Sequence, residues 1–287
     1  MDERAALGTI ADALEHAGDD AAVLDGQVLT TDMLHETTDF PDGTTRYTAG
    51  WRAVGASLSD VAAMGAEATA AVAVYAAPEF VEHEILEFVT GARDVCEIVS
   101  AEYVGGDLDG HGEFTVATTA LGRTDDPVHR SGTEPGEAVC VTGTLGRSAA
   151  ALELFERGDP ERANECFRFA PRVSAGRALA PYASAMMDSS DGLARSLHQL
   201  AEASDCGFAI EREAIPVDGT LQEVAGGEAT ELATFFGEDF ELVVTLPEEA
   251  IEPVREAADV PIAVVGEVTE SGVAMDGEAL PDRGFTH

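Results

Sequence analysis

Short apolar runs alternate with amphipathic segments along this chain of 287 residues, and Gly, Pro and Asp separate them. Strands are expected over the apolar runs 68–76, 114–121, 138–142, 185–187, 208–210, 241–246 and 262–268. Helices are expected where apolar residues recur at helical spacing, over 50–65, 78–100, 190–203 and 248–258. Alternating strands and helices are typical of α/β proteins, so we expect an α/β (α+β) fold.

Two turn-rich segments indicate how the chain is organised. Asp25-Gly26 separates the apolar runs 21–24 and 28–31, which is a strong signal for a β-hairpin. Residues 122–136 are rich in Gly, Pro and charge, as domain linkers are. We therefore expect two domains of similar size, 1–130 and 131–287.

The chain is strongly acidic, with 55 Asp and Glu against 16 basic residues and a net charge of −39. Such a charge repels itself at low ionic strength, whereas at molar salt the Debye length falls to about 3 Å and the repulsion is screened. We interpret the composition as an adaptation to a salty cytoplasm. The alternative, an acidic surface for a basic partner, requires acids clustered in blocks, and here they are scattered. No basic stripe exists, which argues against nucleic-acid binding.

All of the basic residues are Arg, and this excludes some chemistry. A Walker-type phosphate loop and a Schiff base both need Lys, so a nucleotide must be held in another way. No stretch approaches the roughly 20 apolar residues of a membrane span, and the first residues carry acids where a secretory signal carries bases. We expect a cytoplasmic protein with no membrane association. The four Cys are far apart, which favours neither a zinc site nor a disulfide framework.

Short Asp-bearing motifs stand at the predicted ends of elements. Asp20 precedes a strand, Asp32 is expected to end one, Asp60 lies on a helix, and the segment 188–192 joins a strand to a helix. Carboxylates combined with water and phosphate oxygens are what Mg²⁺ prefers, and the Gly pair before Asp107 would let the backbone approach a phosphate. Taken singly, each motif is equally consistent with a turn or a helix cap.

The order of the motifs carries more information than any one of them. Eight motifs follow one another over nearly the whole chain as they do in the thiamine-monophosphate kinase family, which the sequence therefore resembles: Asp20-Ala-Ala-Val-Leu, Thr30-Thr31-Asp32-Met33, the segment from Gly50-Trp51-Arg52 to Ser57-Leu58-Ser59-Asp60 and Met64-Gly65-Ala66, Gly105-Gly106-Asp107, Val141 to Gly146, Asp188 to Leu193, Gly237-Glu238-Asp239-Phe240-Glu241-Leu242, and Val265 to Thr269.

The resemblance implies an aminoimidazole-ribonucleotide-synthetase-like fold. Its N-terminal domain would dimerise and form the nucleotide cleft, and its C-terminal domain would close over the active site. The implied activity is Mg²⁺-dependent transfer of the γ-phosphoryl group of ATP to thiamine monophosphate, which gives thiamine diphosphate and ADP. We therefore expect a homodimer that binds ATP, thiamine monophosphate and several Mg²⁺ ions.

Site residues follow from the same motifs. The positions that match the family's magnesium ligands are Asp20, Thr30, Thr31, Asp32, Asp60, Asp107, Asp188 and Asp191. The positions that match ATP contacts are Gly106, Asp107, Arg130 and Ser190. Glu238 and Phe285 match substrate contacts, and Asp39 stands where the family usually has a substrate-facing His. The segment Leu108-Asp109-Gly110 also departs from the family, which has Thr-Thr-Arg there.

Phosphoryl transfer depends mainly on positioning and charge neutralisation, and a phosphate acceptor is already a nucleophile. We therefore assign no general base. One rival interpretation is another ATP-using enzyme of the same superfamily, such as aminoimidazole ribonucleotide synthetase, selenophosphate synthetase or the carbamoyl-dehydrating hydrogenase-maturation protein. The last two use a Cys near one end of the chain, and no Cys stands there. Another rival is a non-catalytic regulator that binds nucleotide or metal; it would release no ADP when substrate is added.

The charge predicts how stability depends on salt. Because screening removes repulsion among carboxylates, we expect the melting temperature to rise from low salt to about 2 M KCl. Thermal melts recorded across KCl concentrations measure this. A melting temperature that is flat or that falls with salt would contradict the interpretation.

Overall fold

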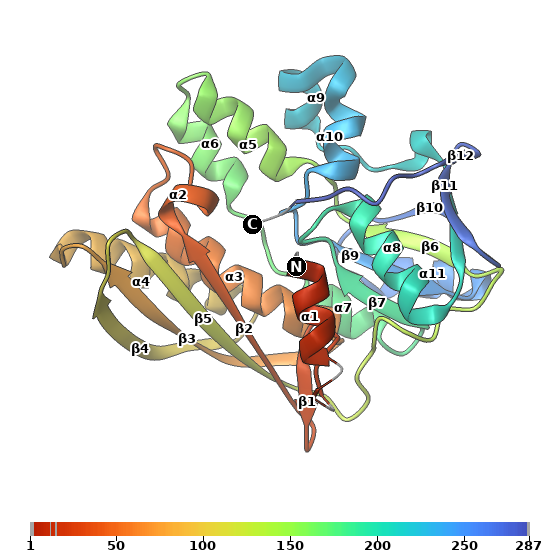
Figure 1. The fold of residues 1–287 in the computed structure, drawn as a ribbon, viewed down its shortest axis with the longest axis horizontal. Helices are drawn as coiled ribbons and strands as arrows, with labels where there is room; N and C mark the ends of the chain where they lie inside the picture. Colours follow the sequence, from red (N-terminus) through yellow and green to blue (C-terminus); the bar gives the residue numbers. More distant parts are fainter. Residues whose placement is uncertain (1–2, 12, 15, 286–287) are drawn as a thin grey trace.

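The computed structural model describes residues 3–11, 13–14 and 16–285. In it, residues 22–123 contain a five-stranded sheet in the spatial order β1-β2-β5-β3-β4 (Figure 1). Its strands are β1 (Ala22–Leu24), β2 (Gln27–His35), β3 (Glu67–Ala77), β4 (Glu102–Gly110) and β5 (Thr115–Arg123). The predicted hairpin is confirmed: β1 and β2 are antiparallel neighbours, and Asp25 and Gly26 take the positive φ values of 51° and 76° that such a tight turn needs.

Two long helices, α3 (Arg46–Ala63) and α4 (Glu82–Ile98), belong to the same half of the protein as this sheet. Helix α3 packs against β2, β3 and β5, and α4 packs on α3. Glycines allow the two helices to approach closely, since a Cβ on Gly50 would lie 2.1 Å from the Phe88 carbonyl oxygen and one on Gly91 2.0 Å from that of Tyr47. The short helices α1 (Glu3–Ala11) and α2 (Glu36–Asp39) complete this half.

The other face of the five-stranded sheet is apolar and exposed. Cross-strand register places Met33, Ala117 and Val74 in one row across β2, β5 and β3, and Leu29 beside Leu121. Residues opposite one another on neighbouring strands share a face. Exposed fractions there reach 55% for Met33 and 40% for Val74. We call this surface the open face.

The second half has a seven-stranded sheet in the order β12-β11-β8-β10-β6-β9-β7. Its strands are β6 (Ala138–Thr142), β7 (Ala185–Asp188), β8 (Gly207–Ile210), β9 (Leu242–Leu246), β10 (Ile262–Thr269), β11 (Gly272–Met275) and β12 (Glu278–Ala279). Its helices are α5 (Arg147–Glu156), α6 (Pro160–Phe167), α7 (Val173–Leu179), α8 (Leu193–Ser204), α9 (Gly219–Ala225), α10 (Ala229–Phe235) and α11 (Ile251–Ala257), with 3₁₀ turns at 212–214, 226–228 and 248–250. Every residue of β6, β7 and β9 is buried, as expected of strands covered on both faces.

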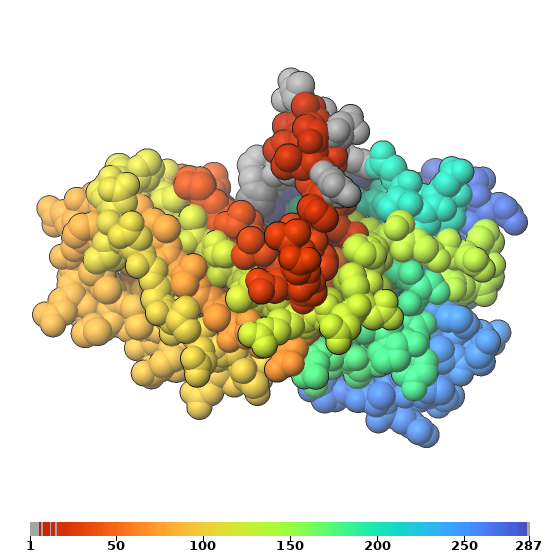
Figure 2. All heavy atoms as spheres, turned by 90° about the horizontal axis from the view of Figure 1, so that it is seen from below, coloured from red at the N-terminus to blue at the C-terminus, as the bar shows by residue number. Residues whose placement is uncertain are grey.

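The two halves meet along α3. This helix contacts both β7 and α7 of the second half, and nearly all of its side chains are buried. In Figure 2 the described residues near the N-terminus, in red, lie between the two halves. The predicted boundary at 130/131 falls in the connection between the sheets and stays a prediction. None of the described helices is long and apolar enough to cross a bilayer.

The mixed α/β fold class and the main strands are confirmed, but some local expectations were wrong. Asp32 does not end a strand, because β2 continues to His35. Gly105-Gly106-Asp107 does not stand at the end of an element, because these residues lie within β4. The helix expected over 190–203 begins only at Leu193, because the residues before it form a turn. Over 248–258 a 3₁₀ turn precedes the short helix α11.

Candidate functional site

Three carboxylates from distant parts of the chain meet at the junction of the two halves. Asp20 precedes β1, Asp60 lies in the last turn of α3, and Asp188 ends β7. One carboxylate oxygen from each lies within 4.8 Å of those from the other two. We call this group the carboxylate cluster. All three residues were predicted as magnesium ligands, and the fold brings them together.

One oxygen atom of the cluster has no hydrogen-bond donor among the described residues. Oδ1 of Asp188 accepts hydrogen bonds from the backbone N of Ser190 at 3.2 Å and from its Oγ at 2.8 Å. Oδ2 of Asp188 is buried, and among the described residues it has no hydrogen-bond partner. The Thr30 hydroxyl donates to Asp60. A buried oxygen without a donor, beside two further carboxylates, fits a hard divalent cation such as Mg²⁺.

Burial and mutual repulsion both disfavour the charged form of these groups. Burial raises the pKa of Asp188 to about 7, and the neighbouring Asp20 adds to the rise. The pKa of Asp60 is raised well above its usual value by burial and then by Asp32, Asp188 and Asp20. Without a cation, the cluster is therefore held partly protonated near neutral pH.

Arg130 supplies one fixed positive charge beside the cluster. Its Nη2 lies 2.8 Å from Oδ1 of Asp20, and its Nε lies 3.2 Å from Oδ2. The Asp20 side chain is completely buried. Burial raises the pKa of Asp20, and the guanidinium of Arg130 acts in the opposite direction. The residue predicted as an ATP contact is thus already placed against a predicted metal ligand.

The Thr30-Thr31-Asp32 motif divides between the two faces of β2. Thr30 and Asp32 lie on the helix-facing side, where Oδ2 of Asp32 accepts a hydrogen bond of 2.5 Å from Ser57 on α3. Thr31 is exposed, and its hydroxyl donates to the Thr118 carbonyl at 2.7 Å. Side chains alternate along a strand, so the Thr31 side chain does not join the cluster.

Gly106 and Asp107 lie apart from the cluster. Register places Asp32, Thr118, Ala73 and Gly106 in one row across four neighbouring strands, β2, β5, β3 and β4. Three strand spacings put about 14 Å between the two ends of this row. Asp107 is exposed and pairs in register with Val74 of the open face. A single ion therefore cannot bind both Asp107 and the cluster in one protomer.

A cavity of about 600 Å³ lies beside Gly106 and Asp107. Tyr75, Phe88 and Val89 are among the residues that line it. Apolar walls next to a glycine-rich strand are suited to a planar base.

Ser190 and Asp191 lie in the turn between β7 and α8, next to the cluster. The C-terminal segment rests on this turn: the backbone N of Phe285 donates to the Asp191 carbonyl at 3.0 Å. A Cβ on Gly284 would lie 2.2 Å from the same carbonyl, so only glycine permits this close approach. The Phe285 ring lies 6.0 Å from that of Phe236, between centroids.

The two remaining predicted substrate contacts, Glu238 and Asp39, are both buried. Arg52 of α3 forms an ion pair with Glu238. Oδ2 of Asp39 accepts hydrogen bonds of 2.7 Å from the backbone N of His35 and from the Thr38 hydroxyl. Arg52 was not singled out from the sequence as a functional residue. The sequence offered no local signal, because Arg52 lies off the apolar stripe of the predicted helix 50–65 and therefore resembles a solvent-facing residue.

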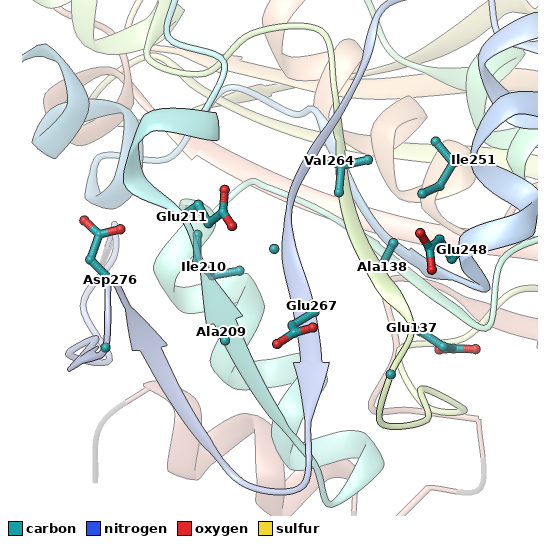
Figure 3. Close-up of a pocket in the computed structure, with 13 residues that line it drawn as sticks. Glu137, Ala138, Ala209, Ile210, Glu211, Glu248, Ile251, Val264, Glu267 and Asp276 are labelled. Carbon is teal, nitrogen blue, oxygen red and sulfur yellow. The ribbon is translucent and has the colours of Figure 1, made fainter.

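A separate cavity of about 460 Å³ lies on the second sheet, beside β6, β8 and β10 (Figure 3). None of the predicted site residues lines it. Its charged lining is acidic: Glu137, Glu211, Glu248, Glu267 and Asp276. The candidate site is therefore the junction of the two halves rather than this cavity.

Comparisons with known proteins agree with the two-part architecture. The AIR synthase related protein family matches with its N-terminal domain at residues 18–124 and its C-terminal domain at residues 134–276. A thiamine-monophosphate kinase from Halobacterium salinarum is 62% identical over 289 residues, covering 100% of both chains. The chain belongs to the thiamine-monophosphate kinase family.

Two further comparisons support the assignment to this family. The enzyme from Methanospirillum hungatei is 38% identical and covers 100% of this chain and 99% of its own. A structure of AaThiL in complex with AMPPCP and TMP superposes with a TM-score of 0.89 at 29% identity, covering 100% of this chain and 97% of that one.

The raised pKa values predict how Mg²⁺ binding depends on pH. The pKa of Asp188 is about 4 in the unfolded chain and about 7 in the folded protein. The folded state therefore binds its proton more tightly, and the free energy of unfolding falls as pH rises from about 4 to about 7. Bound Mg²⁺ would offset this loss, which is on the order of a few kcal/mol. We expect Mg²⁺ to raise the melting temperature more at pH 8 than at pH 5.5, both at high KCl.

The matched variant is Asp188→Asn, which removes one charge from the cluster. It should raise the melting temperature of the metal-free protein at pH 8 and reduce the shift that Mg²⁺ produces. An equal Mg²⁺ shift at both pH values in the unmodified protein would contradict the assignment of the cluster as a metal site.

Proposed function

We propose that this protein is a thiamine-monophosphate kinase, which transfers the γ-phosphoryl group of ATP to the phosphate of thiamine monophosphate. The observation that carries the proposal is the 62% identity to the Halobacterium salinarum enzyme over the full length of both chains. The carboxylate cluster supports it, because phosphoryl transfer needs divalent cations at the phosphates.

Asp20, Asp60 and Asp188 would hold Mg²⁺, with Thr30 and Asp32 next to them. When bound, Mg²⁺ neutralises the charge of the phosphates and orients them for in-line transfer. Arg130 adds a fixed charge on the same side as Asp20, suited to a phosphate oxygen. Asp191 lies in the same turn as Asp188 and belongs to the proposed ligand set.

Substrate contacts are assigned to three regions. Gly106 and Asp107 would contact ATP at the edge strand, and Ser190 would contact it at the turn after β7. Glu238 and Phe285 would contact thiamine monophosphate, the ring of Phe285 offering an aromatic face. Asp39 is assigned a supporting role beside the acceptor, because its carboxylate is already engaged by the backbone of His35.

We further propose a homodimer that forms through the open face. Exposed apolar side chains on a sheet face are what a second copy would cover. Asp107 pairs in register with Val74 on this face, so the metal and ATP roles predicted for it would be roles of the dimer.

We assign the reaction to the cytoplasm, because ATP is a cytoplasmic nucleotide. The net charge of −39 suits a cytoplasm of high salt concentration.

The direct test is formation of thiamine diphosphate from thiamine monophosphate, ATP and Mg²⁺ at high KCl. A superfamily enzyme of another kind, or a non-catalytic regulator, would release no ADP in response to thiamine monophosphate. No thiamine diphosphate from folded, nucleotide-binding protein would overturn the proposed function.

Asp107 and Asp109 offer a matched pair of variants on one exposed strand. Each carboxylate accepts a hydrogen bond from the backbone N of the following residue, so neither substitution by Asn should disturb the fold. We expect Asp107→Asn and Asp191→Asn to lower the rate on the order of a thousandfold, because each loses a charge that holds Mg²⁺. Asp109→Asn should keep the unmodified rate.

The measurement is thiamine diphosphate formation at a series of Mg²⁺ concentrations, with melting temperatures recorded alongside. If the Asp residues served only as turns or caps, Asn would replace them with little effect. Unchanged turnover in both Asp107→Asn and Asp191→Asn would remove these residues from the metal site.

The dimer is tested by light scattering in high salt. We expect a mass of two chains for the unmodified protein and of one chain for Val74→Asp, because a charge on the open face opposes its burial. Leu86→Asp is the control: Leu86 is 58% exposed on α4, away from the open face, and its variant should stay dimeric. A monomeric unmodified protein with full activity would exclude the dimer.

A further inference from the structure

Arg52 is a guanidinium enclosed in the interior of the protein. It lies in the middle of α3 and is 1% exposed. Its Cζ atom lies 3.6 Å from the centroid of the Phe167 ring, and the rings of Phe169 and Phe240 are 5.5 and 5.6 Å away. A buried cation is costly unless every polar contact around it is made, so its partners are specific.

Those partners belong to the second half of the protein. Nη2 of Arg52 donates to Oε2 of Glu238 at 2.5 Å and to the Glu238 carbonyl at 3.3 Å. Nη1 donates to the Ser148 hydroxyl at 3.1 Å and to the Phe167 carbonyl at 2.8 Å. One side chain of α3 therefore fixes both the carboxylate and the backbone of Glu238.

The segment that contains Glu238 has an unusual backbone. Gly237, Glu238 and Phe240 have φ values of 84°, 61° and 55°, and the last two are not glycine. Residues other than glycine persist in the left-handed region only where surrounding contacts hold them, and such residues cluster at functional sites.

Further contacts tie this segment to the turn after β7 and to the start of α5. The backbone N of Glu238 donates to the Ser190 carbonyl at 2.6 Å. The Asp239 carboxylate accepts from the backbone N atoms of Gly146 at 2.5 Å and Ser148 at 3.0 Å. The Ser148 hydroxyl donates to the Glu238 carbonyl at 2.6 Å. Arg52 thus acts on a segment that also contacts the turn with Asp188.

We propose that Arg52 is a positioning residue for the acceptor: it holds Oε2 of Glu238 and leaves Oε1 directed to the thiamine part of the substrate. This inference rests on the proposed function. Among the described residues, the Glu238 carboxylate has no hydrogen bond other than the one from Arg52. Its second oxygen is therefore available to the cationic substrate. A rigid carboxylate loses less conformational freedom on binding than a mobile one.

The primary variant is Arg52→Lys, which keeps the charge and loses the two-pronged contact. We expect the KM for thiamine monophosphate to rise about tenfold, while the KM for ATP and the Mg²⁺ dependence stay unchanged. Arg46→Lys is the matched control on the same helix. Arg46 pairs with Glu36 and Glu84 rather than with Glu238, so its variant should leave both KM values unchanged.

A double-mutant cycle with Glu238→Gln separates positioning from general stability. If Arg52 acts through Glu238, Arg52→Lys should raise the KM for thiamine monophosphate much less in the Glu238→Gln background than in the unmodified one. Ser148→Ala is a second variant that keeps the buried ion pair intact. It removes the hydroxyl that accepts from Nη1 of Arg52 and donates to the Glu238 carbonyl, and it should raise the same KM several-fold.

The outcomes are distinguishable. The inference would be overturned if the effects of Arg52→Lys and Glu238→Gln on the KM for thiamine monophosphate were fully additive. It would also be overturned if Arg52→Lys raised the KM values of both substrates equally. Should Arg52→Lys fail to fold, a Ser148→Ala variant with an unchanged KM for thiamine monophosphate would overturn it as well. Absence of thiamine diphosphate from the unmodified protein would instead contradict the proposed function.

Discussion

Repulsion among three carboxylates at the junction of the two halves, two buried and one half-buried, is the constraint on which the rest of the site depends. Asp20, Asp60 and Asp188 come from a loop, a helix and a strand, and their oxygens meet within 4.8 Å. Burial alone disfavours their charged forms, and each neighbour adds to the effect. Arg130 compensates only Asp20. A divalent cation is the simplest group that stabilises all three as carboxylates, and it would hold the two halves together at the same point.

Helix α3 transmits this arrangement through the molecule. Its Asp60 belongs to the cluster, its Ser57 binds Asp32 on the first sheet, and its Arg52 reaches Glu238 in the second half. These residues are spaced so that one helix presents polar groups to both halves while its apolar side chains fill the core. Displacement of α3 would therefore move the proposed metal ligands and the proposed acceptor contact together. The helix is buried on most sides because the first sheet, α4 and the second half all pack against it.

Local signals allowed much of the fold to be predicted, whereas the site required long-range geometry. The hairpin at Asp25-Gly26 and the buried strands followed from turn chemistry and apolar runs. The separation of Thr31 from Thr30 follows from strand alternation, whereas the place of Asp32 on the same face as Thr30 follows only because β2 extends past Asp32. The distance between Asp107 and the cluster depends on the register of four strands, which no local pattern encodes. Arg52 was missed because its partner lies 186 residues away in the sequence.

The most direct test of the cluster as a metal centre is anomalous diffraction from crystals grown at high KCl with Mn²⁺ in place of Mg²⁺ and a non-hydrolysable ATP analogue. The account predicts an anomalous peak between Asp20, Asp60 and Asp188, within about 2.5 Å of their carboxylate oxygens. A well-ordered nucleotide analogue with no anomalous peak at these three side chains would contradict it.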